Sequence, residues 1–185
     1  LGAGKPVSGQ DPSALKYIST STTVLDWQIH SFQSLVSLNN IHFLGGYNVE
    51  EVIKKYKYLN YSVIPGWENN SVLHTLFNAP FPNDNIIISY SDTIFHKKVI
   101  MQLTEIKADV VYGYDSLWKE RFSTRTAKDI IKAETVFING HEAEFTGLMF
   151  FSKKAVEILS NLKEVNVGNS LLNLIENLKK EDLTV

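Results

Sequence analysis

The feature that most constrains this chain is a regular alternation between short apolar runs and segments with helical periodicity. The clearest run is 86–90, which is apolar except at Ser89 and is therefore typical of a strand buried on both faces. This alternation predicts an α/β layered fold with a mostly parallel sheet, built as a single domain over residues 1–185. Strands are expected near 41–44, 61–64, 86–90, 108–112, 135–138 and 145–151, and helices over 24–36, 49–58, 95–106, 153–162 and 169–179. A further helix is expected through Leu73, Leu76 and Phe77, with the stretch 69–71 (Asn-Asn-Ser) able to cap its start.

The composition narrows the classes of function. A net charge of −2 over 185 residues provides no general basic field, so we expect no binding to nucleic acid. The sequence contains no apolar run approaching the ~20 residues that span a bilayer, so we expect no membrane insertion. The absence of cysteine excludes disulfides, thiolate metal sites and cysteine nucleophiles. We expect a cytoplasmic protein, and a homo-oligomer is compatible with the sequence.

The first residues of the chain carry a glycine-rich loop with lysines beside it. Gly2 and Gly4 bracket an alanine, so the backbone can approach a bulky anion and offer its N–H groups. Lys5 follows at once, and Lys16 follows Pro12 a few residues later, both as charges suited to phosphate. The pattern favours a nucleotide site, with an ordinary glycine turn and two solvated lysines as the alternative.

Polar residues follow several of the predicted strands. In open α/β sheets, ligands bind in the crevice beyond the carboxyl ends of the strands. Asp92 comes directly after the 86–90 strand, where a carboxylate can hold Mg²⁺ against a phosphate. The alternative is that Asp92 caps the next helix, because Ser-Asp-Thr is a good capping sequence. We favour the metal site because the glycine-rich loop is also present.

A second set of charged residues lies in and after the segment 115–126. Arg121 and Arg125 have the bidentate geometry that suits phosphate or phosphonate oxygens. The alternative is a surface loop with Trp118 packed into the core. Glu144 heads the apolar run 145–151 and can either line a site or pair with a basic residue.

Several catalytic patterns are absent. Gly4-Lys5 is followed by proline rather than Ser or Thr and lacks the upstream glycine of a Walker A loop, which excludes P-loop kinases and ATPases. The third glycine of a dinucleotide-binding motif and the serine-hydrolase elbow are also missing. The five histidines have no metal-ligand spacing, so we interpret them as structural or surface residues.

Four segments together resemble the sugar-phosphate nucleotidyltransferase superfamily. The opening Leu1–Gly4, the lysine after Pro12 and the stretch 24–27 (Val-Leu-Asp-Trp) are similar to its first motif, and 89–95 is similar to its metal-binding motif. Within the superfamily, Asp115-x-x-Trp-x-x-Arg121-Phe, Arg125-Thr and Glu144-Phe-Thr-Gly-Leu are most similar to the branch associated with phosphoenolpyruvate phosphomutase. That branch transfers cytidylyl groups to phosphonates or to phosphocholine-like compounds.

This resemblance implies a Rossmann-like three-layer α/β/α fold of the nucleotide-diphospho-sugar transferase type. It also implies a Mg²⁺-dependent transfer of CMP from CTP to a small phosphonate or phosphate acceptor, with release of pyrophosphate. The implied catalytic residues are Lys5, Lys16 and Asp92, with Asp92 as the metal ligand. The implied nucleotide-binding residues are Leu1, Gly2, Ala3, Gly4, Lys5, Asn70 and Ser71, and the implied acceptor-binding residues are Asp115, Arg121, Arg125 and Glu144.

The sequence departs from the family pattern in two places. No arginine follows the glycines, so Lys5 would act alone there or Arg121 would reach in. The family usually has a second metal-binding aspartate on a strand after the last helix, so we expect the first strand and the C-terminal end of the domain to lie outside this sequence. A hexose-1-phosphate nucleotidyltransferase and a nucleotide-binding module without transferase activity remain alternatives.

Overall fold

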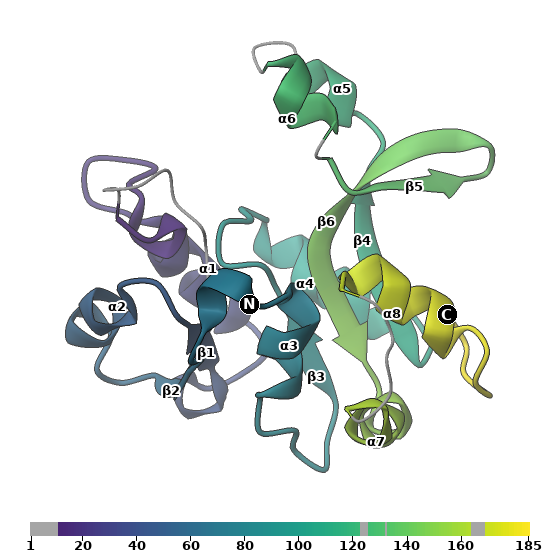
Figure 1. Cartoon of the computed structure of the whole chain (residues 1–185), viewed down its shortest axis with the longest axis horizontal. Coiled ribbons are helices and arrows are strands. Elements are labelled where there is room, and N and C mark those ends of the chain that lie inside the picture. The colour runs from purple at the N-terminus through teal and green to yellow at the C-terminus, as the bar shows by residue number, and fades with distance from the viewer. Residues whose placement is uncertain (1–10, 123–125, 132, 164–168) are drawn as a thin grey trace.

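The computed structural model describes residues 11–122, 126–131, 133–163 and 169–185. Over these residues the chain forms two sheets with helices on both sides (Figure 1). The smaller sheet lies towards the N-terminal end of the chain, and the larger one carries the strands that follow residue 85. The larger sheet positions the candidate site.

The smaller sheet is a parallel pair with its own core. Strand β1 (His42–Gly45) pairs with β2 (Asn60–Val63), and α2 (Val49–Lys55) connects them. Helix α1 (Val24–Phe32) packs its apolar stripe against this pair. A capping box at Thr23 and Asp26 fixes the start of α1, because each side chain accepts from the backbone N–H of the other residue. The buried residues of this core are Ala14, Leu25, Ile29, Phe43, Val49, Val52, Tyr56 and Leu59.

The larger sheet is antiparallel and is organised around one long strand. Strand β6 (His141–Phe151) pairs with β3 (Ile86–Ile88) on one side and with β4 (Val110–Asp115) on the other. Its first residues also pair with β5 (Thr135–Ile138) through a tight hairpin. As a result, β6 links the middle of the molecule to the projecting end that carries β5 (Figure 1).

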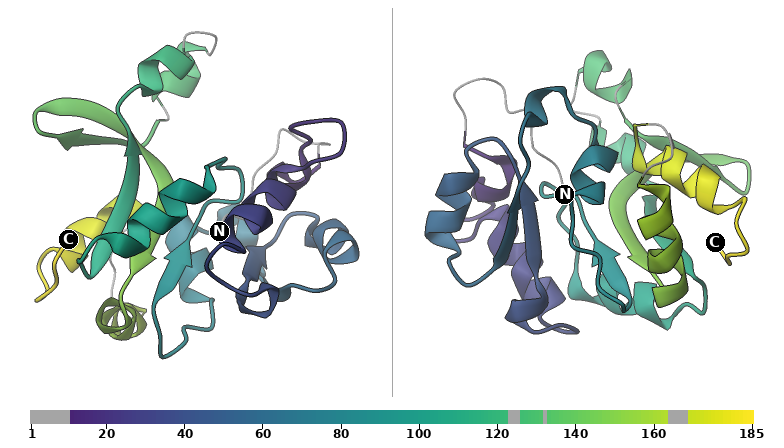
Figure 2. Two further views of the ribbon diagram at one scale, coloured as in Figure 1. Left: turned by 180° about the vertical axis from the view of Figure 1, so that it is seen from behind. Right: turned by 60° about the horizontal axis from the view of Figure 1, so that its bottom comes forward.

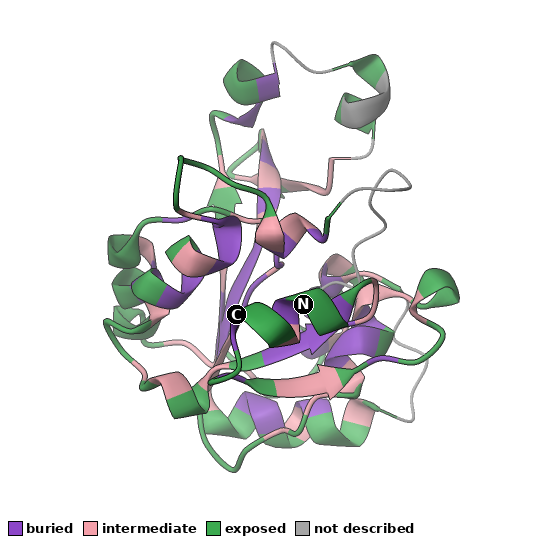
Figure 3. Cartoon of the chain, turned by 90° about the vertical axis from the view of Figure 1, so that its left-hand side faces the viewer, coloured by how far each residue is buried: buried purple, intermediate pink, exposed green. Residues whose placement is uncertain are grey.

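Helices cover both faces of the larger sheet and complete three layers. Successive side chains of β6 point to opposite faces of the sheet. Met149 and Phe151 belong to the core on one face, and Leu148 and Phe150 belong to the core on the other. The second half of β6 is continuously buried, and most exposed residues lie on the outer helices and loops (Figure 3). One face packs against α3 (Val72–Phe77), α7 (Lys153–Leu162) and α8 (Leu171–Leu178), and the other against α4 (Lys97–Glu105) (Figure 2).

Short helices complete the described chain. Two of them, α5 (Trp118–Arg121) and α6 (Ala127–Ile131), lie beside β5 at the projecting end (Figure 1). The alternative of a surface loop with Trp118 packed into the core is therefore confirmed for Trp118, whose side chain is buried against Phe122, and wrong for the loop, which is partly helical. Three 3₁₀ turns are η1 (Ser13–Leu15), η2 (Leu38–Asn40) and η3 (Trp67–Asn69).

The predicted three-layer α/β fold is confirmed, but the direction of the strands differs from the prediction. Among the described strands only β1 and β2 are parallel, whereas β3, β4 and β5 all pair antiparallel with β6. The apolar run 86–90 could not reveal this, because a strand buried on both faces is continuously apolar whichever way its neighbour runs. The predicted helix over 24–36 also stops early, at Phe32.

Candidate functional site

Part of the predicted site lies outside the described part of the chain. The glycine-rich loop, Leu1, Gly2, Ala3 and Gly4 with Lys5, falls there, and so does Arg125. The roles assigned to these residues stay predictions. The remaining predicted residues, from Lys16 to Glu144, can all be placed in the structure.

Asp92 is an exposed residue on a turn that follows β3, and the other residues of this turn are buried or half-buried. The turn runs from Tyr90 to Thr93 and is closed by a 3.5 Å hydrogen bond from the Thr93 N–H to the Tyr90 carbonyl. The alternative in which Asp92 caps the next helix is wrong, because α4 begins at Lys97 and the His96 side chain is its N-cap. Within the described ranges, no hydrogen bond or ion pair engages the Asp92 carboxylate. This carboxylate is therefore available to a ligand.

Two side chains of α1, the buried Gln28 and the exposed Trp27, hold the Asp92 turn from one side. The Gln28 amide nitrogen donates to the Tyr90 carbonyl at 2.8 Å and to the Thr93 carbonyl at 2.6 Å. A little further along, the Trp27 indole N–H donates to the Phe95 carbonyl at 2.6 Å. These bonds tie both ends of the turn to a helix of the neighbouring core, so its backbone is fixed while Asp92 faces solvent.

Strand β6 holds the same turn from the other side. The Tyr90 N–H donates to the Gly147 carbonyl at 3.1 Å, and the Thr93 hydroxyl donates to the Thr146 carbonyl at 2.9 Å. The register between β4 and β6 shifts here, between Tyr112 and Tyr114, so the strand is locally irregular. The Thr-Gly part of the motif Glu144-Phe-Thr-Gly-Leu thus supports the Asp92 turn rather than the acceptor pocket.

Gly147 is required at this position by its backbone and by the space around it. Its φ is +73°, in the left-handed region, and a Cβ added there would lie 2.2 Å from the Tyr90 ring. The Tyr90 hydroxyl donates to the Glu134 carboxylate at 2.7 Å. Burial, followed by the nearby Glu134 charge, raises the pKa of Tyr90 above its ordinary value, so its hydroxyl remains a donor at neutral pH.

Three of the predicted acceptor residues meet at the base of the projecting end. Asp115 and Glu144 are register partners on β4 and β6. The Arg121 guanidinium forms ion pairs with both carboxylates, at 3.1 Å to Glu144 and in close contact with Asp115. The structure therefore brings Asp115, Arg121 and Glu144 together, and the Arg121 side chain is 61% exposed.

The predicted residues on the other segments occupy surface positions. The Lys16 side chain is exposed and has no hydrogen bond or ion pair with the described residues. Ser71 is the N-cap of α3, where its hydroxyl accepts from the His74 N–H. The Asn70 amide donates to the Pro65 carbonyl at 3.1 Å and closes a turn there. Asn70 and Ser71 thus have local structural partners, which leaves their predicted contacts with a nucleoside as predictions.

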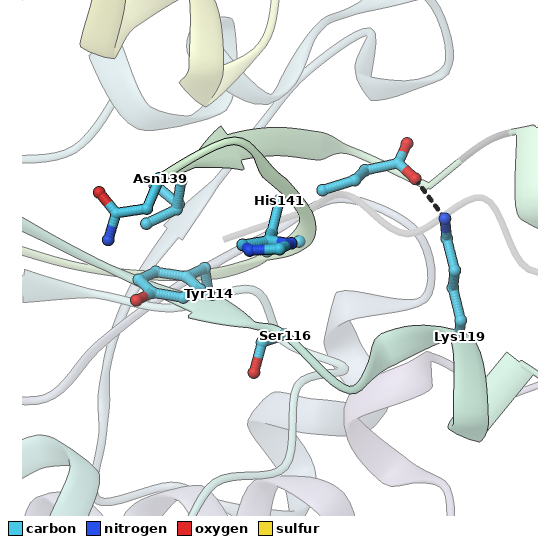
Figure 4. Close-up of a pocket in the computed structure, with 8 residues that line it drawn as sticks. Tyr114, Ser116, Lys119, Asn139 and His141 are labelled. Atoms are coloured by element: carbon cyan, nitrogen blue, oxygen red, sulfur yellow. Dashed lines mark ion pairs between the residues drawn. The ribbon is translucent and has the colours of Figure 1, made fainter.

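A shallow pocket lies next to the cluster formed by Asp115, Arg121 and Glu144 (Figure 4). It has a volume of about 520 Å³, and its lining includes the side chains of Tyr114, Asn139 and His141, which Figure 4 labels. The Lys119–Glu142 ion pair, at 2.7 Å, closes one end. Of the predicted site residues that the structure describes, none lines this pocket, although Tyr114 is adjacent to Asp115.

Comparison with known proteins places this geometry in a familiar fold. The CTP:phosphoglutamine cytidylyltransferase of Campylobacter jejuni is 25% identical over 155 residues, covering 70% of this chain and 60% of that relative. The chain thus spans less than two thirds of the length of this relative. No protein-family model matches the chain.

Solved structures agree with the sequence relative. The putative glucose-1-phosphate thymidylyltransferase from Bacillus anthracis has a TM-score of 0.68 at 14% identity, covering 98% of this chain and 80% of that one. The inositol-1-phosphate CTP transferase from T. maritima has a TM-score of 0.64 at 14% identity, covering 97% and 77%. The chain has a nucleotidyltransferase fold. The CTP:phosphocholine cytidylyltransferase from Streptococcus pneumoniae shares it, with a TM-score of 0.57 at 13% identity, covering 99% and 83%.

These comparisons confirm the predicted resemblance to nucleotidyltransferases, with cytidylyltransferases among the relatives. They do not bear on the narrower branch associated with phosphoenolpyruvate phosphomutase, which stays a prediction. In the part of the chain that the structure describes, no helix is long and apolar enough to cross a membrane.

The nucleotidyltransferase fold also allows a test of whether Asp92 fits a magnesium ion. Across the described ranges, no cluster of three or more His, Cys, Asp or Glu side chains forms a closed metal cage. Mg²⁺ does not require such a cage, because it usually takes one or two carboxylates together with substrate phosphates and water. A single exposed carboxylate on a fixed turn fits that requirement.

Sequence reasoning missed two residues that shape the candidate site. Gln28 was not singled out, although a buried amide next to the apolar stripe position Ile29 is an available signal. Glu134 was also missed. Its contact with Tyr90 spans 44 positions in the sequence, and no local spacing pattern could have indicated it.

Proposed function

We propose that this chain carries out cytidylyl transfer, joining the CMP part of CTP to a small phosphorylated acceptor and releasing pyrophosphate. The observation that carries the proposal is the exposed Asp92 carboxylate, which no described residue engages by a hydrogen bond or ion pair, on a turn held from both sides. The similarity to a CTP:phosphoglutamine cytidylyltransferase supports CTP as the donor. The acceptor is a small phosphate or phosphonate.

In the proposed reaction, an oxygen of the acceptor phosphate or phosphonate attacks the α-phosphorus of CTP in line. A new P–O bond forms there, the bond to the β-phosphate oxygen breaks, and pyrophosphate leaves with both bonding electrons. The protein contributes position and charge rather than covalent chemistry. Mg²⁺ bound at Asp92 would supply positive charge next to the triphosphate.

The other residues have roles that follow from where they lie. Lys16 is an exposed cation without a protein partner among the described residues, which suits contact with the triphosphate. The loop Gly2–Lys5 would bind the same phosphates. Arg121 is the cation that would bind the acceptor anion, with Asp115 and Glu144 orienting its guanidinium.

The experiment is a pyrophosphate-release assay over a matrix of donors and acceptors. CTP, UTP, TTP and ATP are each combined with aminoethylphosphonate, phosphocholine or glucose-1-phosphate. We expect release with CTP and a small phosphate or phosphonate acceptor. Release only with a sugar phosphate would favour the hexose-1-phosphate alternative, which the thymidylyltransferase-like structure supports. CTP binding without release from any pair would contradict the proposal and favour a binding module.

The metal role is tested in the same assay with Asp92→Ala. We expect the Mg²⁺-dependent rate to fall by at least about a hundredfold, because the group that would hold the charge at the triphosphate is lost. Asp84→Ala is the matched control, because Asp84 is an exposed carboxylate that precedes β3 rather than following it. A variant at Asp92 that stays active would show that the metal assignment is wrong.

A further inference from the structure

We propose that Gln28 is a positioning residue that sets the place of the Asp92 carboxylate. This inference rests on the proposed function and adds to it a group on α1 that touches neither substrate nor metal. Gln28 acts through backbone carbonyls on either side of Asp92, so its effect on turnover requires Asp92.

The contacts of Gln28 are specific to the turn. Its amide nitrogen donates one hydrogen to the Tyr90 carbonyl at 2.8 Å and the other to the Thr93 carbonyl at 2.6 Å. Tyr90 and Thr93 are the first and last residues of the turn that contains Asp92. A single side chain therefore spans both ends of the turn and uses both of its donors there.

Burial makes this arrangement costly to lose. Gln28 is only 4% exposed, and a buried primary amide is destabilising unless its donors are satisfied. A helix that needed only an apolar contact here would gain more from Leu or Met, which form helices as well as Gln does. The amide thus offers what an apolar side chain cannot, a fixed distance between two carbonyls.

The other hydrogen bonds around the turn do not replace those of Gln28 on the side that faces α1. Trp27 and Ser31, the neighbouring donors of α1, both reach the Phe95 carbonyl, three residues beyond Asp92. On the β6 side, Thr146 and Gly147 accept from Thr93 and Tyr90. Among the described residues of α1, Gln28 is the one whose side chain bonds the Tyr90–Thr93 turn itself.

The test compares Gln28→Met with Gln33→Met in the full chain. Both replacements keep the length of the side chain and remove the amide, but Gln33 is exposed at the end of α1. We expect Gln28→Met to raise amide hydrogen exchange at residues 91–93 and to lower kcat by about tenfold, because small misplacements of a reacting geometry have large effects on rate. Gln33→Met should change neither by more than about twofold.

A double-mutant cycle with Asp92→Asn separates positioning from a general structural role. If Gln28 acts through Asp92, adding Gln28→Met to Asp92→Asn should lower kcat no further. Effects on kcat that multiply independently would overturn the inference, as would unchanged exchange at residues 91–93 in Gln28→Met. An inactive wild-type chain would instead contradict the proposed function, and the exchange measurement distinguishes that failure from a failure of Gln28 to hold the turn.

Discussion

The Asp92 turn and the Asp115–Arg121–Glu144 cluster are both acidic, but they are held in opposite ways. Neutral hydrogen bonds from Gln28 and to β6 fix the backbone of the Asp92 turn, and they leave its carboxylate unengaged by the described residues. In the cluster, the charged groups engage each other, with Arg121 between two carboxylates. Hydrogen bonds to the backbone hold the Asp92 turn, whereas ion pairs between its own side chains hold the Asp115–Arg121–Glu144 cluster.

This difference suits two different tasks. A group that must meet a metal and a triphosphate at a set position benefits from a rigid turn, because rigidity lowers the cost of ordering it during the reaction. A site that must accept an anion can exchange one partner of Arg121 for the ligand, because exposed ion pairs contribute little to stability. The comparison therefore predicts that damage to the turn costs stability, whereas damage to the cluster changes binding more than folding.

The largest expected effect is that of Gly147→Ala. The added Cβ would lie 2.2 Å from the Tyr90 ring at a residue whose φ is +73°. We expect a loss of about 3 kcal/mol or more in the free energy of unfolding, from left-handed strain together with overpacking. Chemical denaturation measures it.

Gly140→Ala is the matched control for Gly147→Ala. Its φ is +81°, but an added Cβ there meets nothing within 4 Å. We expect about 1–2 kcal/mol from backbone strain alone. Equal losses in the free energy of unfolding at the two glycines would mean that the Tyr90 ring can move aside. That result would contradict the rigid turn on which the comparison of the two regions depends.

The intermediate effect is that of Tyr90→Phe, which keeps the ring and removes the hydroxyl that donates to Glu134 at 2.7 Å. We expect a loss of about 1 kcal/mol, because a part-buried carboxylate loses its donor. Tyr112→Phe is the control, because its ring packs edge-on against Phe145 as the Tyr90 ring does. Its hydroxyl has no hydrogen bond among the described residues. An equal loss in both variants, measured by urea unfolding, would assign the effect to the rings.

The sequence predicted the order of the strands and the longer helices and the position of Asp92 after β3, for physical reasons that are local, but it did not predict the short helices α5 and α6. Apolar periodicity identified α7 as Lys153–Leu162 and β5 as Thr135–Ile138 with the expected bounds. The Ser71 cap of α3 was also predicted correctly, because capping depends on residues a few positions apart. The early end of α1 at Phe32 was not predicted, since the apolar stripe continues to Val36 beyond the helix.

What the sequence could not predict depends on contacts between distant segments. The antiparallel pairing of β3 with β6 brings together residues about 60 positions apart in the sequence, so no local sequence pattern could indicate its direction. The support of the Asp92 turn by Gln28 spans 62 and 65 positions. In contrast, Asp115 and Glu144 were predicted as one group through the family resemblance, and their strand register places them directly opposite each other.

The smallest expected effect on stability is that of Arg121→Ala. Removing the guanidinium leaves the Asp115 and Glu144 carboxylates opposite each other on paired strands, where like charges repel. Because the Arg121 side chain is 61% exposed, we expect a loss of at most about 0.5 kcal/mol at low salt, and less at 0.5 M salt where the repulsion is screened. The KM for the acceptor should rise by about tenfold, because a charged hydrogen-bond donor to the anion is lost.

Lys119→Ala is the control, because Lys119 lies on the same helix and forms an exposed ion pair with Glu142 at 2.7 Å. A large loss of stability with an unchanged KM in Arg121→Ala would show that the cluster is a structural element like the Asp92 turn.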